Sequence, residues 1–405
     1  MTEILVVDAI MGKGKTQYAI QHMNEASPLD SFIFITPFLS EVERIKTSVT
    51  EHCFVEPTIY NGTSKLEDLK RLVANNRNIV STHALFAKAD EELIELLEQS
   101  GYTLILDEVM DIVESVPIKS ADIKRLQSNG DIVINEDTMR VDWTGDPNDN
   151  SRYKDIRELA QAGNLYLFRG SFMVWTFPPA VFKAFPKAIV LTYLFKCQMQ
   201  RYYFDMFGLE YEFKSVQKNG DKYELCDYDV KAEGREKLRE LINVTDNEKL
   251  NAVGKGKYAL SQAKLKKYDI DTLDQIKKNT VNFFKHYADN AKVADVYIST
   301  LKEVEPYLAP RGFSVKNCFI PHNARATNEY ANRRAVAYLI NRFMNKDKMS
   351  FFQDNCVSVD EDLYALSELV QWLWRSRIRN GEPIHAYIPS ERMRELLDKW
   401  TRYEI

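Results

Sequence analysis

The stretch Ile4–Thr16, ILVVDAIMGKGKT, joins a short apolar run to a loop rich in glycine and lysine. The apolar run Ile4–Val7 is typical of a buried β-strand. A helical pattern follows at once, from Thr16 to Asn24. A strand, a glycine-rich loop and a helix in this order are the context in which a loop binds phosphate groups. The stretch therefore predicts an α/β fold whose first strand ends in an anion-binding loop.

The loop residues have distinct expected roles toward a nucleoside triphosphate. Two glycines allow the backbone to curl so that its N–H groups face an anion, and the N-terminus of the next helix adds partial positive charge. Lys15 is expected to reach the β- and γ-phosphates, and the Thr16 hydroxyl to bind Mg²⁺. Ala9 stands where such loops usually begin with glycine, which requires a negative φ at that position. The predicted nucleotide-binding residues are Gly12, Lys13, Gly14, Lys15 and Thr16.

Short apolar runs continue through the first half of the chain. The further predicted strands are Phe32–Ile35, Asn78–Ser81, Thr103–Leu106 and Ala188–Leu191, and the predicted helices between them include Leu39–Ser48 and Glu91–Glu98. Near-continuous apolar strands that alternate with helices indicate a parallel sheet covered on both faces. A hairpin excursion is expected between Asn129 and Asn150.

The second half repeats this alternation. Its predicted strands are Tyr223–Cys226, Val293–Ser299, Ser314–Ile320 and Ile384–Ile388, and its predicted helices are Thr272–Tyr287, Thr327–Phe343, Asp360–Arg377 and Ser390–Trp400. The fold class is therefore α/β, with two tandem domains whose parallel sheets are covered by helices. We place the domains at residues 1–195 and 196–405, with an insertion in the second half at about 214–290.

An acidic pair, Asp107 and Glu108, follows the predicted strand Thr103–Leu106 of the first half. In open α/β sheets, ligands bind at the carboxyl ends of the strands. We expect Asp107 to hold Mg²⁺, directly or through water, and Glu108 to orient and deprotonate the attacking water. An isolated acidic pair after a strand is often only a turn or a helix cap. The phosphate loop upstream favours the catalytic interpretation, and the adjacent glutamate fits a family that hydrolyses ATP.

Gln371, Arg375 and Arg379 lie at the spacing i, i+4, i+8. If the helix predicted there continues, this spacing stacks them on one face. A solvated basic face is the commoner meaning of the pattern. However, an arginine supplied from a second domain stabilises transition-state charge in phosphoryl transfer, with effects of about 10³–10⁵ in rate. We therefore predict that these three residues contact the triphosphate.

The composition is that of a soluble globular protein, with 45% hydrophobic and 28% charged residues and a formal net charge of -5. This balance gives no overall basic field, so contact with nucleic acid must come from local patches. The cysteines form no Cys-x-x-Cys pair, and no metal is expected beyond Mg²⁺. The sequence has no secretory signal and no long apolar run, which predicts a cytoplasmic protein.

In order along most of the chain, the sequence resembles the superfamily-2 (DEAD/DEAH-like) helicases, particularly small helicase-like proteins of bacteriophages. The similar segments are Gly12–Thr16 (motif I), Ile35–Pro37 (Ia), Ser81–His83, Asp107–Met110 (the D-E-x-x box), Leu191–Tyr193 (III), Asn323–Asn328 (V) and Gln371–Arg379 (VI). Trp374 and Ile378 stand where motif VI usually has glycine and its second arginine. The sequence leaves open which of Arg375, Arg377 and Arg379 is the arginine finger.

The resemblance implies two RecA-like domains with ATP and Mg²⁺ in the cleft between them. It implies an ATP-dependent helicase or translocase of phage replication or recombination, in the host cytoplasm. The implied partner is single-stranded or forked nucleic acid, with DNA favoured over RNA, and the favoured state is a monomer. The residues implied to contact nucleic acid are Thr36, Pro37, Thr82, His83, Asn323, Arg325 and Thr327.

The stretch Lys249–Lys267 holds six lysines and no acidic residue, with Tyr258 among them. Two interpretations stay open. The stretch contacts phosphates and stacks a base on the tyrosine, or it is a solvated surface loop.

Two other activities are compatible with the phosphate loop. An ATP-gated clamp or loader would hold nucleic acid without processive movement, and strand displacement separates it from a motor. A P-loop kinase would transfer phosphate to a small acceptor with turnover insensitive to nucleic acid. The kinase leaves the arginines and the second α/β half unexplained.

Overall fold

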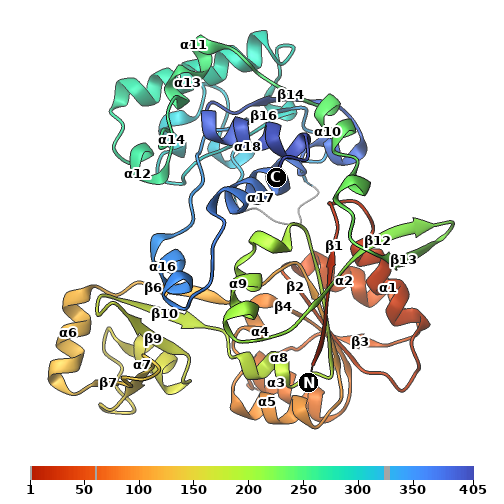
Figure 1. The fold of residues 1–405 in the computed structure, drawn as a ribbon, viewed down its shortest axis with the longest axis vertical. Coiled ribbons are helices and arrows are strands. Elements are labelled where there is room, and N and C mark those ends of the chain that lie inside the picture. Colours follow the sequence, from red (N-terminus) through yellow and green to blue (C-terminus); the bar gives the residue numbers. More distant parts are fainter. Residues whose placement is uncertain (1, 60–61, 323–328) are drawn as a thin grey trace. The chain divides into compact units, whose positions relative to one another are not determined.

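The computed structural model describes residues 2–59, 62–322 and 329–405. The chain forms two compact units. Unit 1 comprises Met1–Ala9, Lys13–Tyr228 and Asn345–Val359, and unit 2 comprises Ile10–Gly12, Asp229–Met344 and Asp360–Ile405. Each unit holds a parallel sheet with helices packed on it (Figure 1), so the predicted α/β class is confirmed.

Unit 1 is built on an eight-stranded sheet of order β13-β12-β1-β11-β5-β2-β4-β3. Its strands are β1 (Glu3–Asp8), β2 (Phe32–Thr36), β3 (Phe54–Val55), β4 (Asn78–Thr82), β5 (Thr103–Asp107), β11 (Lys187–Thr192), β12 (Glu212–Asn219) and β13 (Lys222–Cys226). All of the neighbouring pairs are parallel except β12 and β13, which form an edge hairpin. Because β12 and β13 extend the sheet beyond β1, unit 1 continues to Tyr228, whereas we expected a boundary at residue 195.

Helices cover this sheet on both faces. They are α1 (Lys15–Glu25), α2 (Leu39–Ser48), α3 (Lys65–Ala74), α4 (His83–Phe86), α5 (Glu91–Glu98), α8 (Pro179–Lys183) and α9 (Met199–Met206). Leu5 and Val7 pack in one core cluster with residues of α1 and α2. The alternate residues Ile4 and Val6, on the other face, are only 3% and 0% exposed. Burial on both faces explains why the strand reads as a continuous apolar run.

A small module is inserted between β5 and β11. It contains β6 (Val113–Val116), α6 (Ser120–Asn129), β7 (Ile132–Ile134), β8 (Val141–Trp143), α7 (Lys154–Gln161), β9 (Leu165–Phe168) and β10 (Phe172–Thr176). Strands β6, β10 and β9 form an antiparallel sheet, and β7 pairs with β8. The module has its own core, which includes Ile123, Val141 and Leu167. The expected hairpin is β7–β8, so that prediction is confirmed, but it is only one part of this module.

One segment of the second half of the chain, residues 345–359, belongs to unit 1, and we name it the strap. Its helix α16 (Lys346–Asp354) lies against β6 and β10 (Figure 1). Phe351 meets Phe168 of β9 edge to face, with ring centroids 4.7 Å apart. Phe352 is fully buried, and its ring lies 5.5 Å from that of Tyr202 on α9. The strap therefore connects the inserted module to the helical layer of the main sheet.

Unit 2 contains a four-stranded, fully parallel sheet of order β14-β17-β16-β15. Its strands are β14 (Ile242–Val244), β15 (Val296–Ser299), β16 (Ala335–Tyr338) and β17 (Ile384–Tyr387). Its helices are α10 (Arg235–Leu241), α11 (Glu248–Asn251), α12 (Gln262–Leu265), α13 (Ile270–His286), α14 (Glu305–Leu308), α15 (Val315–Cys318), α17 (Glu361–Leu373) and α18 (Glu391–Thr401).

Two predictions for unit 2 are wrong. Ser314–Ile320 is not a strand, because the Ser314 side chain accepts a hydrogen bond from Asn317 N–H and caps the short helix α15. The described part of the helix predicted at Thr327–Phe343, residues 329–343, is not helical, because its apolar run forms β16, which lies between β15 and β17 and is fully buried. A buried strand and a buried helix segment present the same apolar run, and periodicity alone does not separate them.

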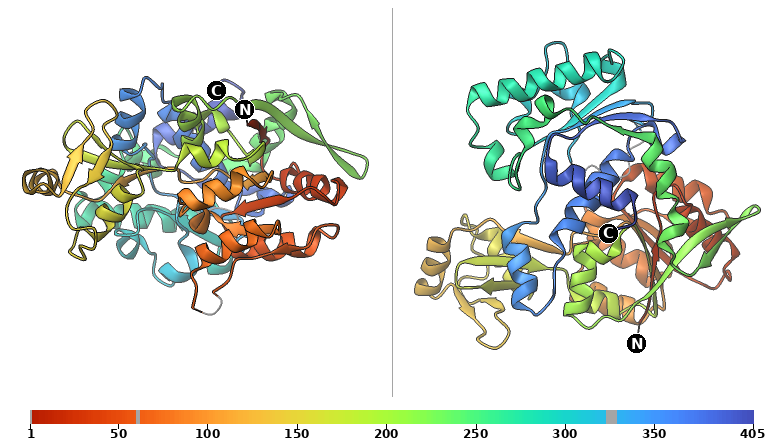
Figure 2. Two further views of the ribbon diagram at one scale, coloured as in Figure 1. Left: turned by 90° about the horizontal axis from the view of Figure 1, so that it is seen from below. Right: turned by 45° about the horizontal axis from the view of Figure 1, so that its top comes forward.

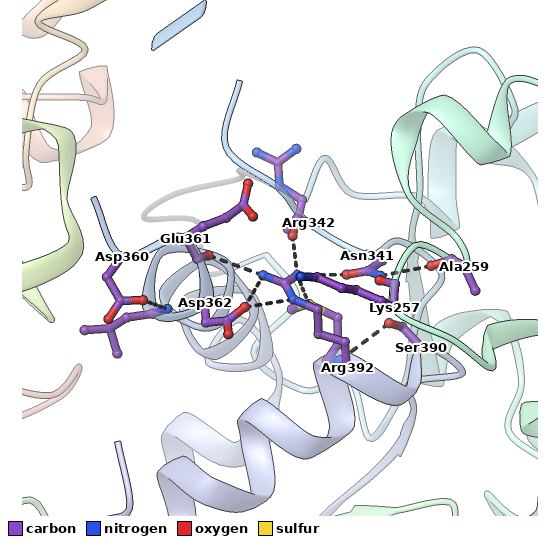
Figure 3. Close-up of polar contacts among 11 residues, drawn as sticks. Lys257, Ala259, Asn341, Arg342, Asp360, Glu361, Asp362, Ser390 and Arg392 are labelled. Atoms are coloured by element: carbon purple, nitrogen blue, oxygen red, sulfur yellow. Dashed lines mark hydrogen bonds and ion pairs between the residues drawn. The ribbon is translucent and has the colours of Figure 1, made fainter. Parts of the chain in front are cut away.

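Arg392 of α18 joins four parts of unit 2 (Figure 3). Its guanidinium donates to Asn341 Oδ1 at 2.9 Å, to the Arg342 carbonyl at 2.6 Å and to Asp362 Oδ1 at 2.6 Å. Asn341 in turn donates to the carbonyls of Lys257 and Ala259. This network fixes the segment after β16, the start of α17 and part of the lysine-rich stretch to α18. Among the described residues, no helix has the length and apolar character needed to cross a bilayer.

Candidate active site

The glycine-rich loop between β1 and α1 adopts the conformation that its sequence requires. Gly12 and Gly14 have φ values of 83° and 97°, a region that favours glycine. Gly14 is the N-cap residue of α1, so the backbone N–H groups of the loop lie beside the positive end of that helix. Ala9 is not among the non-glycine residues with positive φ. The alanine in place of glycine is therefore sterically compatible with the loop.

Lys15 and Thr16 are the first residues of helix α1, and their side chains donate hydrogen bonds to different acceptors. The Lys15 ammonium donates to the Ala9 carbonyl at 2.5 Å, and the residue is 9% exposed. The Thr16 hydroxyl donates to Asp107 Oδ1 at 3.2 Å. This contact joins the phosphate loop to the acidic strand, although 91 residues separate the two partners in sequence. Parallel topology explains it, because β1 and β5 are separated by a single strand, β11, and end at the same edge.

Asp107 is buried, with 8% of its surface exposed. Burial first, and then the negative charges of Glu108 and Glu41, raise the pKa of Asp107 to about 7. The hydrogen bond from Thr16 and the charge of Lys15 act in the opposite direction. Desolvation and nearby negative charges make the ionised form of this carboxylate unfavourable, and a nearby cation would stabilise that form. The site therefore favours positive charge beside Asp107.

Glu108 occupies an uncommon backbone conformation, with φ at 67°. Its N–H donates to the Leu191 carbonyl of β11 at 2.8 Å, which ends the β5 ladder and turns the chain. The Met110 N–H then donates to Gln200 Oε1 of α9 at 3.0 Å. Gln200 is fully buried, and its bond to Met110 holds the backbone of the acidic turn in place. Non-glycine residues in this conformation cost free energy and are concentrated at functional sites.

Strand β11 is also fastened to the phosphate-loop strand. Both Asp8 carboxylate oxygens accept backbone N–H groups, from Leu194 at 3.0 Å and Phe195 at 2.8 Å. The Ala9 N–H donates to the Thr192 carbonyl at 3.1 Å. Asp8, Gln200 and Glu41 were not predicted from the sequence. They lie outside the recognisable motifs, and their contacts join segments 66 to 187 residues apart.

The predicted nucleic-acid residues of unit 1 lie at the same edge of the sheet. Thr36 ends β2 and Thr82 ends β4, and the two are register partners in adjacent strands. Thr82 is the N-cap residue of α4, and His83 is its first residue. Pro37, Thr82 and His83 are partly exposed, whereas Thr36 is fully buried. The structure thus brings these four residues together, with Thr36 beneath the surface.

The predicted arginine face of unit 2 differs from the expected continuous helix. Helix α17 ends at Leu373, so the i, i+4, i+8 argument is wrong beyond Gln371. The Ser376 hydroxyl donates to the Leu373 carbonyl at 2.6 Å and starts a 3₁₀ turn over Arg377–Asn380. Arg375 therefore lies in the turn after α17, and the exposed Arg379 lies in the 3₁₀ turn.

Arg377 has a clear structural role, because its Nε donates to the Pro383 carbonyl at 2.6 Å.

Asn323, Arg325 and Thr327 lie outside the described residues. In the lysine-rich stretch, Lys255 and Lys257 are exposed and Tyr258 is 58% exposed.

Tyr223 of β13, which the sequence does not mark as a site residue, lies against the phosphate loop. A Cβ added to Gly14 would be only 2.0 Å from Tyr223 Cε1. The sequence offers no signal for this contact, because the two residues are about two hundred positions apart and Tyr223 lies in an ordinary alternating strand. In both views of Figure 2 the β12–β13 hairpin lies beside α1.

Comparisons with known proteins identify relatives of this chain. Two family models match it, the YonV middle domain over residues 113–175 and the YonV C-terminal Rossmann-like domain over residues 236–401. The first match coincides with the inserted module, and the second lies within the part of the chain that forms unit 2 and the strap.

Among solved structures, S. tokodaii Xpd4 is 11% identical with a TM-score of 0.49, covering 100% of this chain and 94% of that one. The DUF1998 helicase MrfA bound to DNA and AMPPNP is 9% identical with a TM-score of 0.36, covering 100% of this chain and 48% of that one. The Sulfolobus solfataricus SWI2/SNF2 ATPase core in complex with dsDNA is 12% identical with a TM-score of 0.26, covering 96% and 83%.

All of these TM-scores are below 0.5, so the assignment to a family depends on sequence. The SPbeta prophage-derived uncharacterized protein YonV of Bacillus subtilis (strain 168) is 38% identical over 410 residues, which cover 99% of this chain and 99% of that protein. The chain belongs to the YonV family.

Proposed function

We propose that this protein is an ATP-hydrolysing enzyme of the superfamily-2 helicase type that acts on nucleic acid, as a helicase or translocase. The observation that carries the proposal is the contact of Thr16 with Asp107 at 3.2 Å. This contact brings the glycine-rich loop, the Asp107 carboxylate and the adjacent Glu108 to one edge of one sheet. Those are the parts that hydrolysis of a triphosphate requires.

The residues at this edge fit Mg²⁺ together with a triphosphate. Thr16 and Asp107 supply one hydroxyl and one carboxylate, and Mg²⁺ is commonly held by one or two carboxylates with substrate phosphates and water completing its shell. Among the described residues, no group of three or more His, Cys, Asp or Glu could hold a metal ion. When bound, the ion would neutralise charge on the β- and γ-phosphate oxygens.

Each residue then has a defined step. Lys15 exchanges the Ala9 carbonyl for phosphate oxygens, because its ammonium then meets a negatively charged acceptor in place of a neutral one. Glu108 accepts a proton from a water molecule whose oxygen attacks the γ-phosphorus, and ADP leaves. The N–H bond to Leu191 keeps the Glu108 backbone fixed during this step. Gln371, Arg375 and Arg379 are proposed to contact the triphosphate from unit 2.

The route from hydrolysis to nucleic acid is short within unit 1. Strand β5 pairs with β2, and β2 pairs with β4, so Asp107, Thr36 and Thr82 end three adjacent strands. A change at the acidic turn can therefore move the residues proposed to contact the strand, namely Thr36, Pro37, Thr82 and His83. Asn323, Arg325 and Thr327 are proposed to hold the strand from the second half. The proposed site of action is the cytoplasm, with single-stranded or forked DNA as the favoured partner.

The test uses purified protein and the variants Lys15→Ala and Glu108→Gln. ATP turnover is measured with single-stranded, duplex and forked DNA and with single-stranded RNA, followed by strand displacement. We expect nucleic acid to stimulate the wild type. We expect Glu108→Gln to bind ATP while turnover falls roughly 10²- to 10⁴-fold, and Lys15→Ala to lose both. Asp111→Asn, an exposed carboxylate three residues beyond Glu108, is the matched control.

The outcomes separate the competing activities. Unchanged turnover in Glu108→Gln would remove the glutamate from its role as the base. Turnover that nucleic acid does not affect would indicate a kinase or another phosphotransferase. Stimulated turnover without strand displacement or movement would favour an ATP-gated clamp or loader.

A further inference from the structure

The direction of a bound triphosphate follows from the strand order of unit 1. Asp107 ends β5 and Glu108 follows it; β5 lies two places from β1 on one side, whereas β12 and β13 lie on the other side of β1. Under the proposed function, hydrolysis takes place at the acidic turn, so the γ-phosphate faces that turn. The nucleoside end must then leave the phosphate loop on the opposite side, toward the β12–β13 hairpin.

Tyr223 lies at that side of the loop. A Cβ built on Gly14 would be 2.0 Å from Tyr223 Cε1, 2.5 Å from Cδ1 and 3.0 Å from Cζ, so the ring rests directly on the loop backbone. The side chain is nevertheless partly exposed. The Lys218 ammonium is 6.0 Å from the centre of the ring. An aromatic ring in contact with a phosphate loop and still accessible to solvent can stack against a flat ligand.

The position of Tyr223 is fixed by helix α1 itself. Gln21 pairs with both backbone groups of Tyr223: the Tyr223 N–H donates to Gln21 Oε1 at 2.8 Å, and Gln21 Nε2 donates to the Tyr223 carbonyl at 3.2 Å. Lys222 forms an ion pair with Glu25 at 2.8 Å. The hairpin is thus attached to the same helix whose N-terminus would hold the phosphates. A preorganised ring loses little conformational freedom when a ligand binds.

We propose that Tyr223 is the platform on which the purine base of the bound nucleotide stacks. The proposal rests on the proposed function, in which the triphosphate binds at Lys15 and Thr16. A base presents a π-face that stacks on an aromatic side chain irrespective of sequence. Tyr223 supplies this face from an edge hairpin that follows the phosphate loop by about two hundred residues.

Tyr223 also packs beside the hydrophobic core, so the experiment must separate stacking from packing. Tyr223 and Leu225 are both partly buried residues of β13 packed against the same cluster. Tyr223→Leu keeps apolar volume over Gly14 but removes the aromatic face, and Tyr223→Phe keeps the face. Leu225→Ala removes packing from the same side of the same strand and serves as the matched control.

Binding of ATP and of inorganic tripolyphosphate is measured by calorimetry for the full-length wild type and these variants. We expect Tyr223→Leu to weaken ATP binding roughly 10- to 100-fold, the equivalent of one lost stacked base. Its tripolyphosphate binding should stay within about twofold of the wild type. Tyr223→Phe and Leu225→Ala should bind both ligands like the wild type.

Equal weakening of ATP and tripolyphosphate by Tyr223→Leu would overturn the proposal and assign Tyr223 to the support of the loop. Unchanged ATP binding in Tyr223→Leu would overturn it as well. A wild type that binds neither ligand would refute the proposed function itself. That result differs from both of the others, because they require a wild type that binds tripolyphosphate.

Discussion

At the residue scale, Asp107 combines burial with a charge that its proposed role requires. The carboxyl group is almost removed from water and has Glu108 and Glu41 nearby, so its ionised form is unfavourable in the ligand-free protein. The hydrogen bond from Thr16 offsets only part of this penalty. The folded protein therefore carries a free-energy cost at Asp107 that a bound cation would remove.

This cost predicts a pH-dependent stability. The folded-state pKa of about 7 exceeds the ordinary 3.8 of an aspartate, so the unfolded chain releases this proton at lower pH than the folded chain. Below about pH 4 both states hold the proton, and the term vanishes. As pH rises from about 4 to about 7 the folded state loses stability, and above about pH 7 the loss is constant.

Asp107→Asn should therefore be more stable than the wild type at pH 8, by up to roughly 4 kcal/mol at roughly 1.4 kcal/mol per pKa unit. The difference should disappear near pH 4. Urea unfolding across this pH range, with EDTA present, measures it. The exposed Asp111→Asn should show no such trend. A less stable Asp107→Asn at pH 8 would show that the buried charge is already compensated.

The site residues that could be predicted are those whose chemistry is encoded locally. A phosphate loop is indicated by Gly12, Gly14, Lys15 and Thr16, because the glycines and the following helix are adjacent in sequence. Asp107 could be paired with them only through the expectation that parallel strands end at one edge. Tyr223 could not be predicted, since its contact with Gly14 depends on the packing of an edge hairpin on α1.

At the element scale, the sequence predicted several elements to within a residue, but it did not predict where side-chain contacts end a helix. The strand Thr103–Leu106 and the helices Leu39–Ser48 and Glu91–Glu98 agree with the structure within a residue. The end of α17 at Leu373 was missed because no glycine or proline marks it. The Ser376 hydroxyl, which bonds the Leu373 carbonyl, ends the helix instead. Such a capping contact depends on a side-chain orientation that the sequence does not reveal.

The Arg392 network shows how elements of unit 2 depend on one side chain. Its bonds to Asn341 Oδ1 and the Arg342 carbonyl satisfy acceptors in the segment that follows β16 (Figure 3). The ion pair with Asp362 contributes less, because the Asp362 side chain is 64% exposed. The guanidinium also lies 4.3 Å from the centre of the Phe343 ring.

Arg392→Lys should therefore lower the free energy of unfolding of the protein by about 2 kcal/mol, since one ammonium cannot replace the fork of donors. Guanidinium chloride unfolding followed by circular dichroism measures the change. Arg402→Lys is the control, because Arg402 pairs with Asp398 on an exposed helix face and should contribute less than about 1 kcal/mol. Equal effects of the two substitutions would mean that the network does not stabilise unit 2.

At the scale of the whole molecule, the two units are not consecutive pieces of chain. The strap, residues 345–359, leaves unit 2 after Met344, packs within unit 1 and returns at Asp360. Its buried residues Phe351 and Phe352 contact the inserted module and α9. We placed a single boundary at residue 195, because alternation of strands and helices does not show which sheet a later helix joins. The structure therefore predicts that unit 1 is incomplete without a segment from the second half.

A fragment of residues 1–228 tests this dependence. Alone it should unfold at a lower temperature than the same fragment mixed with a synthetic peptide of residues 345–359. A peptide with Phe352→Ala should bind at least roughly 100-fold more weakly, because removing a buried phenylalanine side chain costs about 3–5 kcal/mol. A peptide with Asp354→Ala should bind nearly as well as the natural one, since the Arg169–Asp354 pair is largely exposed. If neither the natural peptide nor a covalently linked strap raised the unfolding temperature, the strap would not be part of the folding unit. In that case, the contacts of the strap would not stabilise the attachment of the inserted module to the rest of unit 1.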